Sequence, residues 1–355
     1  MKKTEQILNT TRHKILSGAY GNSGEQFLAI RDFADREGIA YLTACHVFSE
    51  LKEEGLLFLL KKRWFLCNGI CSRNSPLGKH TDKKIIGLHV KEINNPYISE
   101  NVFHLQKILS KEKTELVIRT SENDSQNEKS ALRFFIEIGC EGVINFPSSD
   151  ESLISFYKSY PLPMVFVGRI IDEKLVSIIT DNYGMGSHIA KFLHNRGYSS
   201  FLFVGLQQFA DPANERLNGF ISYLHSENLS FSTENIHRLN LTNNTYVTQF
   251  MHCLRSLIKT GNTVGIFCLN DLLAYKALKI VERIGFSVPE QVGIVGYDNL
   301  PISALSKISI TSVSYDYKEL AREAYSILSG IVKTRKLIRP PKTIPNHLVI
   351  RNSTK

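Results

Sequence analysis

Polar residues that directly follow apolar runs are the strongest candidates for a binding site in this 355-residue chain. Asn270 and Asp271 follow the run 266–269, and Asp298 follows the run 294–295. A helix-length segment with one apolar face lies between the runs, and strand, helix, strand without a hairpin turn predicts a parallel βαβ unit. Because open α/β sheets bind ligands at the carboxyl ends of their strands, we expect Asn270 and Asp298 to face one crevice. An amide and a carboxylate there can donate to and accept from the hydroxyl groups of a polyol.

The same stretch carries an ordered set of motifs. Its elements are an Asn-Asp pair at a strand end, an Ala three residues further on, and a Gly- and Pro-containing loop that leads to Gly-Tyr-Asp: Asn270-Asp271, Ala274, 285–289 and Gly296-Tyr297-Asp298. This set resembles the effector domain of the lactose-repressor family, which is similar to the periplasmic sugar-binding proteins. Each motif alone is common by chance, but the ordered set at this spacing is specific. The resemblance extends over nearly all of residues 84–355.

The resemblance implies further site residues. Arg216 stands in an Arg-x-x-Gly motif whose Arg reaches ligand oxygens in the family. Tyr97 follows an Asn-Pro pair where the family places an aromatic or apolar wall, Tyr317 occupies a position that is often aromatic, and Ser149 follows the third strand. For Arg216 the alternative is a position on a helix surface, and for each tyrosine the alternative is a position in the core. For Asp271 the alternative is a cap on the following helix instead of a ligand contact.

The elements that position these residues alternate between strands and helices from residue 84 onward. The first set predicts strands at 85–90, 116–118, 142–146 and 164–167, with helices near 98–110, 126–138 and 151–159. The second set predicts strands at 201–204, 236–239, 266–269 and 294–295. We expect 311–313 to cross back to the first lobe, and the last helix to run over 318–332. The predicted fold class is therefore α/β, with two Rossmann-like lobes.

Residues 1–68 have a different spacing of apolar residues, which predicts a winged helix-turn-helix head. Apolar residues recur at helical spacing over 4–17, 27–37 and 41–54, and the apolar runs 56–60 and 64–67 flank a basic tip at 61–63. Residues 69–83 are polar and rich in Gly and Ser, which predicts a linker. Residues 84–355 then form the effector-binding and dimerisation domain.

The head resembles the GntR-type DNA-binding domain, through "LKEEGLL" at the end of the third helix and an Arg in the second helix. A GntR-type head on a lactose-repressor-like body is the arrangement of arabinose-repressor-type regulators. The third helix departs from that family, because 39–49 contains no Lys or Arg. Two interpretations therefore remain open: a DNA-binding head, or a head that keeps its fold without binding DNA. The predicted DNA contacts are Arg31, Tyr41, Thr43, His46, Lys61, Lys62 and Arg63.

Composition and motifs narrow the function classes. A composition of 43% hydrophobic and 22% charged residues argues against wholesale disorder, and a net charge of +9 suits an anionic partner. No apolar run is long enough to span a membrane, and the N-terminus lacks the apolar core of a secretory signal, so we expect a cytoplasmic protein. The six cysteines fit no metal-finger spacing and are expected to be reduced. Cys67, Cys71 and His80 are the alternative metal ligands.

The catalytic motifs of the common enzyme classes are missing from the sequence. The sequence has no phosphate-binding loop, no Gly-x-Ser-x-Gly and no His-Glu-x-x-His, and Gly184-Met-Gly186 lacks the third Gly of a dinucleotide fingerprint. We therefore expect no enzyme, no cofactor and no metal site. The two resemblances imply a homodimeric transcription regulator that binds a double-stranded DNA operator. A small molecule, a sugar or sugar derivative, closes its two lobes. The alternatives are a sensor with a degenerate head, a Rossmann-like enzyme and an exported sugar-binding protein.

Overall fold

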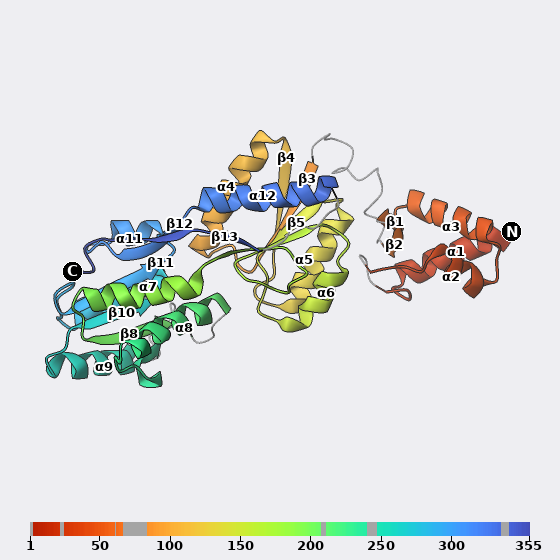
Figure 1. The fold of residues 1–355 in the computed structure, drawn as a ribbon. Coiled ribbons are helices and arrows are strands. Elements are labelled where there is room, and N and C mark those ends of the chain that lie inside the picture. Colours follow the sequence, from red (N-terminus) through yellow and green to blue (C-terminus); the bar gives the residue numbers. More distant parts are fainter. Residues whose placement is uncertain are drawn as a thin grey trace.

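The computed structural model describes residues 3–21, 25–60, 62–66, 84–206, 211–239, 247–334 and 341–355. A small helical head at the N-terminus is followed by a body of two α/β lobes, and the C-terminus lies in the lobe further from the head (Figure 1). Four features named above lie outside the described residues: Lys61, the linker 69–83, the Cys67–Cys71 pair and His80.

The head contains the elements predicted for it. Three helices precede a two-stranded antiparallel hairpin: α1 (Lys3–Leu16), α2 (Ile30–Glu37), α3 (Tyr41–Glu53), β1 (Leu57–Leu60) and β2 (Arg63–Leu66). Helix α2 begins later than predicted, because the segment before it is extended. Gln26 forms a bridge with Phe65, and the Phe27 amide donates to the Trp64 carbonyl over 2.8 Å. Phe27 is therefore buried beside the hairpin instead of within a helix.

A short turn fixes the angle between α2 and α3. Gly38 ends α2 with φ 61°, a left-handed conformation that glycine adopts without steric cost, and its amide donates to carbonyls of the last turn. The rings of Phe33 and Phe48 then meet edge to face, with centroids 5.2 Å apart. This contact buries one face of α3 and leaves the opposite face in solvent.

The first lobe is a six-stranded sheet with the order β13-β7-β6-β5-β3-β4, in which each paired strand is parallel. Its elements are β3 (Lys84–Val90), α4 (Pro96–Lys111), β4 (Thr114–Thr120), α5 (Ser125–Glu137), β5 (Gly142–Asn145), η1 (Glu151–Leu153), α6 (Ile154–Ser159), β6 (Met164–Val167), β7 (Ser177–Thr180) and β13 (Lys342–Ile344). All four predicted strands are present. Strands β7 and β13 were not predicted, because they are short and carry polar residues.

The second lobe is also a six-stranded sheet, with the order β14-β12-β11-β10-β8-β9. Its elements are α7 (Asn182–Asn195), β8 (Ser200–Gly205), α8 (Asp211–Ser226), η2 (Thr233–Asn235), β9 (Ile236–Arg238), α9 (Val247–Lys259), β10 (Val264–Cys268), α10 (Asp271–Arg283), β11 (Val292–Tyr297), α11 (Pro301–Leu305), β12 (Thr311–Tyr315) and β14 (Asn346–Val349). Strands β10 and β11 pair in parallel, with Ile266 opposite Ile294. The βαβ unit predicted from the first motif is confirmed.

The prediction that 311–313 crosses to the first lobe is wrong. This segment is strand β12 of the second sheet, parallel to β11 and antiparallel to β14. The chain crosses after β12 instead, and α12 (Tyr317–Thr334) packs beside α4 in the first lobe (Figure 1). A buried apolar run does not reveal which sheet it joins. Two other crossings, between β7 and α7 and between β13 and β14, make three connections between the lobes.

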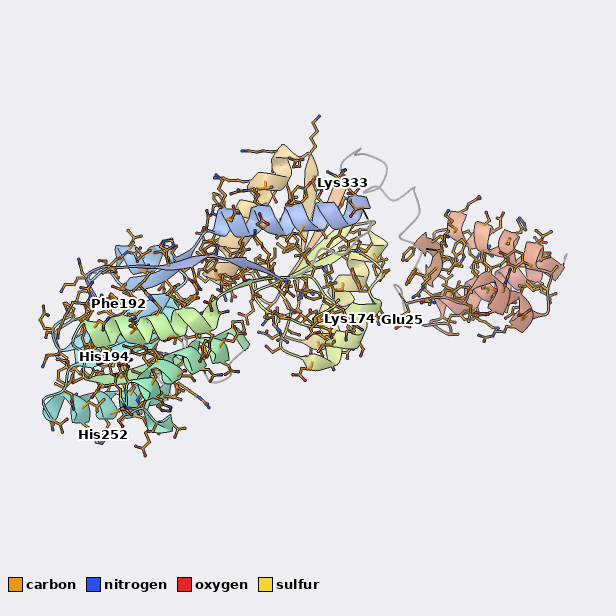
Figure 2. All side chains as sticks on the ribbon, in the orientation of Figure 1. Glu25, Lys174, Phe192, His194, His252 and Lys333 are labelled. Carbon is orange, nitrogen blue, oxygen red and sulfur yellow. The ribbon has the colours of Figure 1, made fainter. Side chains whose placement is uncertain are left out.

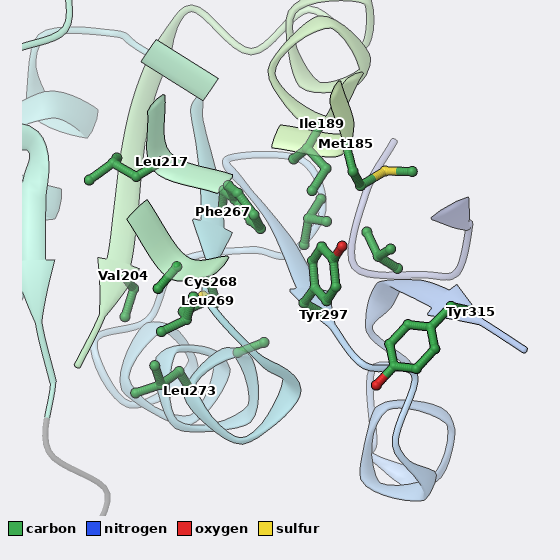
Figure 3. Packing of buried hydrophobic residues seen from close by; sticks show 14 of the residues in the cluster. Met185, Ile189, Val204, Leu217, Phe267, Cys268, Leu269, Leu273, Tyr297 and Tyr315 are labelled. Carbon is green, nitrogen blue, oxygen red and sulfur yellow. The ribbon is translucent and has the colours of Figure 1, made fainter. Parts of the chain in front are cut away.

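Buried side chains fill the space between the layers of each unit (Figure 2). In the second lobe, Phe267, Leu273 and Tyr297 belong to one core cluster that also includes Tyr315 at the crossing (Figure 3). The large apolar residues of α4 and α5 are not all part of the core. Leu105 and Phe135 are core residues, whereas Phe103 is 50% exposed with Lys107 Nζ 4.1 Å from its ring centroid.

The head contacts the first lobe through α5. Arg133 Nη2 donates to Glu25 Oε1 over 2.9 Å, and Phe58 of the hairpin packs against the apolar cluster that contains Leu132. Figure 2 shows Glu25 on the side of the head that faces the body. Because both ends of the ion pair are partly exposed, the pair contributes at most about 1 kcal/mol of stability.

Candidate functional site

A cleft of about 570 Å³ lies between the two lobes. Five of the six predicted ligand contacts line it, and they come from separate segments: Tyr97, Ser149, Arg216, Asn270 and Asp298. Tyr317 does not line it. Other polar lining residues are Lys91, Glu92, Asn95, Asn123, Ser148, Asp150, Arg169, Thr180 and Asn182. The volume falls within the range of small-molecule sites.

The Asn-Asp and Gly-Tyr-Asp motifs meet inside the second lobe. A Cβ on Gly296 would lie 2.1 Å from Asp271 Oδ1 and 3.2 Å from the Ala274 side chain, so only glycine fits beneath them. The buried Asp271 carboxylate accepts from the Leu300 amide and from the Ser312 hydroxyl, each over 2.6 Å. It thus joins the ends of β10, β11 and β12. Burial raises the pKa of Asp271 to about 7, while the two hydrogen bonds act in the opposite direction.

Asn270, and not Asp271, caps helix α10. Its Oδ1 accepts from the Leu273 amide over 3.0 Å. The alternative cap proposed from the sequence is therefore wrong, because the backbone at Asn270 is extended and Asp271 already points into the core. Asn270 also lines the cleft, where its Nδ2 group is available as a donor.

Two close backbone contacts between helices α7 and α8 position Arg216. A Cβ on Gly219 would lie 1.9 Å from the Tyr183 carbonyl oxygen, and one on Gly186 would lie 2.0 Å from the Arg216 carbonyl oxygen. Helices α7 and α8 can approach this closely only because both positions are glycine. The Arg-x-x-Gly motif therefore has a physical reason, since its Gly brings the helix turn that carries Arg216 against α7.

The Arg216 guanidinium is held on three sides. Its Nε donates to Asn182 Oδ1 and its Nη1 to the Leu269 carbonyl, both over 2.9 Å. Its Cζ lies 3.4 Å from the centroid of the Tyr297 ring, a stacked cation–π contact. These contacts use only part of its five N–H donors. The remaining donors lie at the wall of the cleft, where an oxygen-rich ligand can accept from them.

Asp298 is a strongly perturbed carboxylate at the wall of the cleft. It is only 8% exposed, and burial raises its pKa to about 6, although nearby Arg216 opposes the shift. Its backbone φ is 94°, an uncommon conformation for a residue with a side chain. Both features raise the free energy of the folded state. Costs of this kind are concentrated at functional sites.

Three tyrosines form the aromatic wall near the crossing. The Tyr97 ring lies 5.9 Å from Tyr315 and 6.1 Å from Tyr317, measured between centroids. Tyr315 lines the cleft and Tyr317 lies behind it, with its hydroxyl donating to the Asp298 carbonyl over 2.8 Å. Of the two predicted tyrosines, Tyr97 lines the cleft and Tyr317 does not, while Tyr315, which was not predicted, does. Tyr317 supports Asp298, and Tyr315 offers its ring to the cleft.

A buried polar network, for which the sequence pattern carries no signal, supports the first-lobe wall. Glu128 on α5 is fully buried, and its carboxylate accepts from the Ser148 amide, the Asn145 side chain and the Tyr157 hydroxyl. Asn145 Oδ1 lies 2.7 Å from the Nδ1 of the buried His89, whose pKa burial lowers despite the nearby Glu128 charge. Charged and polar residues scattered over 89–157 gave no spacing that would join them.

The predicted DNA contacts lie on the exposed side of the head. Tyr41 and His46 are exposed on α3, whereas Thr43 is half-buried. Arg31, at the start of α2, has its guanidinium carbon 6.0 Å from the Tyr41 ring centroid. At the hairpin tip, Lys62 and Arg63 are exposed. The structure therefore brings Arg31 and Tyr41 together. Lys62 and Arg63 belong to a different element, the hairpin.

Comparison with known proteins gives the fold of the body. Residues 190–354 match the periplasmic binding protein-like domain. The transcription regulator CcpA of Lactococcus lactis superposes with a TM-score of 0.67 at 22% identity, covering 77% of this chain and 100% of that chain. Residues 84–355 have a periplasmic-binding-protein-like fold.

Other relatives of the periplasmic-binding-protein-like body are regulators. The chain is 27% identical over 252 residues to the sucrose operon repressor of Pediococcus pentosaceus, covering 71% of this chain and 74% of the repressor. A LacI family transcriptional regulator from Lactobacillus casei with bound glucose has a TM-score of 0.65 at 19% identity, covering 77% of this chain and 100% of that chain. Within the described ranges, no helix is long and apolar enough to cross a membrane. No cluster of potential metal ligands occurs in that part of the chain.

Replacing Asp298 with Asn is expected to stabilise the unliganded protein at pH 7.5. The folded pKa of about 6 lies above the ordinary value of 3.8, so the charged carboxylate destabilises the folded state above pH 6 and the penalty fades as pH falls toward 4. We expect a gain of roughly 1–3 kcal/mol in unfolding free energy at pH 7.5, which narrows by pH 5. Urea denaturation at both pH values measures it. Asp316→Asn, at an exposed helix cap, is the matched control and should be neutral. A variant less stable than wild type at pH 7.5 contradicts the assignment.

Replacing Glu128 with Ala is expected to destabilise the first lobe by roughly 3–5 kcal/mol, the usual cost of breaking a buried charged network. The Ser148 amide and the Tyr157 hydroxyl lose their acceptor in a buried environment. Thermal and urea unfolding measure the loss. Gln126→Ala, on the exposed side of the same helix, should change stability by about 0.5 kcal/mol or less. Equal stability of the two variants would show that the network is not a support.

Proposed function

We propose that this chain is a transcription regulator whose affinity for DNA is controlled by a small molecule bound between the two lobes. The observation that carries this proposal is the convergence of Arg216, Asn270 and Asp298 on one cleft of a periplasmic-binding-protein-like body. The repressor names of its relatives support it. The head supplies the DNA contact, and the body supplies the control.

The ligand is a sugar or sugar derivative. Asn270 Nδ2 and the unused donors of Arg216 offer N–H groups, while Asp298 offers carboxylate oxygens, and hydroxyl groups both accept from and donate to such a set. The rings of Tyr97 and Tyr315 supply an apolar face for the C–H side of a sugar ring. The bound glucose in the Lactobacillus casei regulator supports this ligand class.

Ligand binding acts on the head by closing the lobes. The three crossings form the hinge, and Asn346 ties two of them together, because its Nδ2 lies 3.0 Å from the Asp181 carbonyl and 3.2 Å from the Tyr297 hydroxyl. A ligand that contacts both lobes binds the closed state more tightly and shifts the equilibrium toward it. In a cytoplasmic homodimer, closure changes the relative placement of the two heads and so their joint affinity for an operator.

The head is a winged helix-turn-helix of the GntR type. Helix α3 lies in the major groove, and Arg31, Lys62 and Arg63 contact phosphates. The remaining predicted contacts are Tyr41, Thr43, His46 and Lys61, the last of which lies outside the described residues. A second candidate is a sensor whose head does not bind DNA. The lack of Lys and Arg between residues 39 and 49 favours it, and the DNA experiment below separates the two.

Replacing Arg216 with Ala is expected to abolish stabilisation by the ligand. The variant loses charge-assisted hydrogen bonds to ligand oxygens, each typically worth about 1.5–3 kcal/mol. Thermal shift against a panel of mono- and disaccharides at millimolar concentration first identifies a ligand for the wild-type chain, and calorimetry then compares the variants. Arg255→Ala, an exposed position on α9, should bind like wild type. Full ligand affinity in the Arg216 variant would place the ligand elsewhere.

Reversing Lys62 and Arg63 to Glu is expected to weaken binding to every DNA sequence. Phosphate contacts carry no sequence information, and their loss also lowers the salt dependence of the binding constant by about two units of slope. Fluorescence anisotropy between 50 and 200 mM salt, roughly the range over which such contacts matter, measures both effects. Reversing Arg255 and Lys259 makes the same charge change on α9, far from the head (Figure 1). If wild type binds no DNA in this range, the sensor alternative replaces the regulator.

A further inference from the structure

The solvent-facing side of α3 is apolar where it begins. Leu42 is 80% exposed and Tyr41 is 49% exposed, in the first turn of the helix. Cys45, His46 and Ser49 continue the same side. The opposite side is the packing face, where Ala44, Val47, Phe48 and Leu51 are buried.

Leu42 has no packing role within the described head. Its side chain is the most exposed leucine of that region, and it belongs to none of the apolar clusters. Burial of a leucine typically stabilises a protein by about 1.5–3 kcal/mol, and this residue contributes little of that. An exposed leucine that adjoins a second exposed apolar side chain, Tyr41, on the outward side of a helix is typical of a surface that another molecule covers. Arg31 lies next to Tyr41, and Lys62 and Arg63 are exposed on the hairpin, so the charge of the surroundings suits an anionic molecule.

The exposed side of α3 also lacks the residues that read guanine and adenine. Arg and Lys pair with guanine, and Asn and Gln pair with adenine, through two hydrogen bonds each. None of these residue types is present between 39 and 49. Thymine differs from the other bases by a methyl group in the major groove, and an apolar side chain is what recognises that group. The first turn of a recognition helix is the part that reaches the base edges.

We infer that Leu42 is a specificity-determining residue that contacts thymine methyl groups, so that the head prefers A·T-rich half-sites. This inference rests on the proposed function, because it requires that the head binds DNA. Arg31 and the hairpin cations then supply affinity for phosphates, and Leu42 supplies discrimination. Tyr41 covers the neighbouring sugar–phosphate edge, with Arg31 at 6.0 Å from its ring.

The test begins with selection of preferred sequences from random duplex DNA by the full chain. Each thymine of the selected site is then replaced by deoxyuridine, which removes one methyl group and leaves the hydrogen-bonding pattern of the base unchanged. We expect wild type to lose about four-fold in affinity at one or two positions of each half-site, as burial of one methyl group implies. The Leu42→Ala variant should bind the thymine and deoxyuridine sites equally at those positions, while it keeps the wild-type melting temperature.

Leu16→Ala is the matched control. Leu16 is 60% exposed at the end of α1, so the same truncation occurs on another surface of the head, and this variant should keep full sensitivity to deoxyuridine. Wild type that is insensitive to every deoxyuridine, or a Leu42→Ala variant with unchanged sensitivity, overturns the inference while DNA binding stands. If selection enriches no sequence over random DNA, the regulator proposal fails first, and the inference fails with it.

Discussion

The second lobe depends on one buried carboxylate that lies over a glycine. Asp271 occupies the space that a Gly296 side chain would fill, and its two oxygens bind the Leu300 amide and the Ser312 hydroxyl. These bonds hold the ends of β10, β11 and β12 at one level. Asn270 directly precedes Asp271, and Asp298 directly follows β11. The same hydrogen bonds therefore fix the positions of both residues at the cleft. The spacing of the two motifs therefore has a cause in packing as well as in the proposed binding.

The two sides of the cleft are built on different principles. On the second lobe, glycine contacts and a cap fix the polar groups before any ligand arrives: Gly186 and Gly219 set Arg216, and helix α10 sets Asn270. On the first lobe, Tyr97 and the loop of Ser148 rest on the Glu128 network and on the crossing. Groups held in this way lose little conformational entropy on binding. A ligand that contacts both sides must therefore be accommodated by movement at the hinge.

The sequence predicted the strands because buried parallel strands are short apolar runs, and runs such as those of β6 and β10 are legible without a structure. Prediction from the sequence failed where the role of a residue depends on which residues lie next to it in the folded chain. Nothing in the spacing of Tyr315 and Tyr317 tells which ring faces the cleft, and nothing in Asn270-Asp271 tells which residue caps the helix. The sheet that β12 joins, and the short polar strands β13 and β14, depend on pairing partners far away in the chain. The Glu128 network was invisible for the same reason.

Asp298 connects the stability of the free protein to its proposed control. Its burial raises its pKa to about 6, so at neutral pH the free protein carries a charged group with incomplete solvation. Its positive φ adds strain that Tyr317 and the Val313 carbonyl hold in place through bonds to its backbone. A polyol that donates hydroxyl protons to this carboxylate restores part of the lost solvation. Asp298 and Arg216 both belong to the second lobe, so in the proposed closed state the other hydroxyls of the polyol contact the first-lobe wall, which carries Tyr97 and Ser149. The free energy released at Asp298 is thus coupled to closure, which is the differential affinity that a ligand needs to shift a two-state equilibrium.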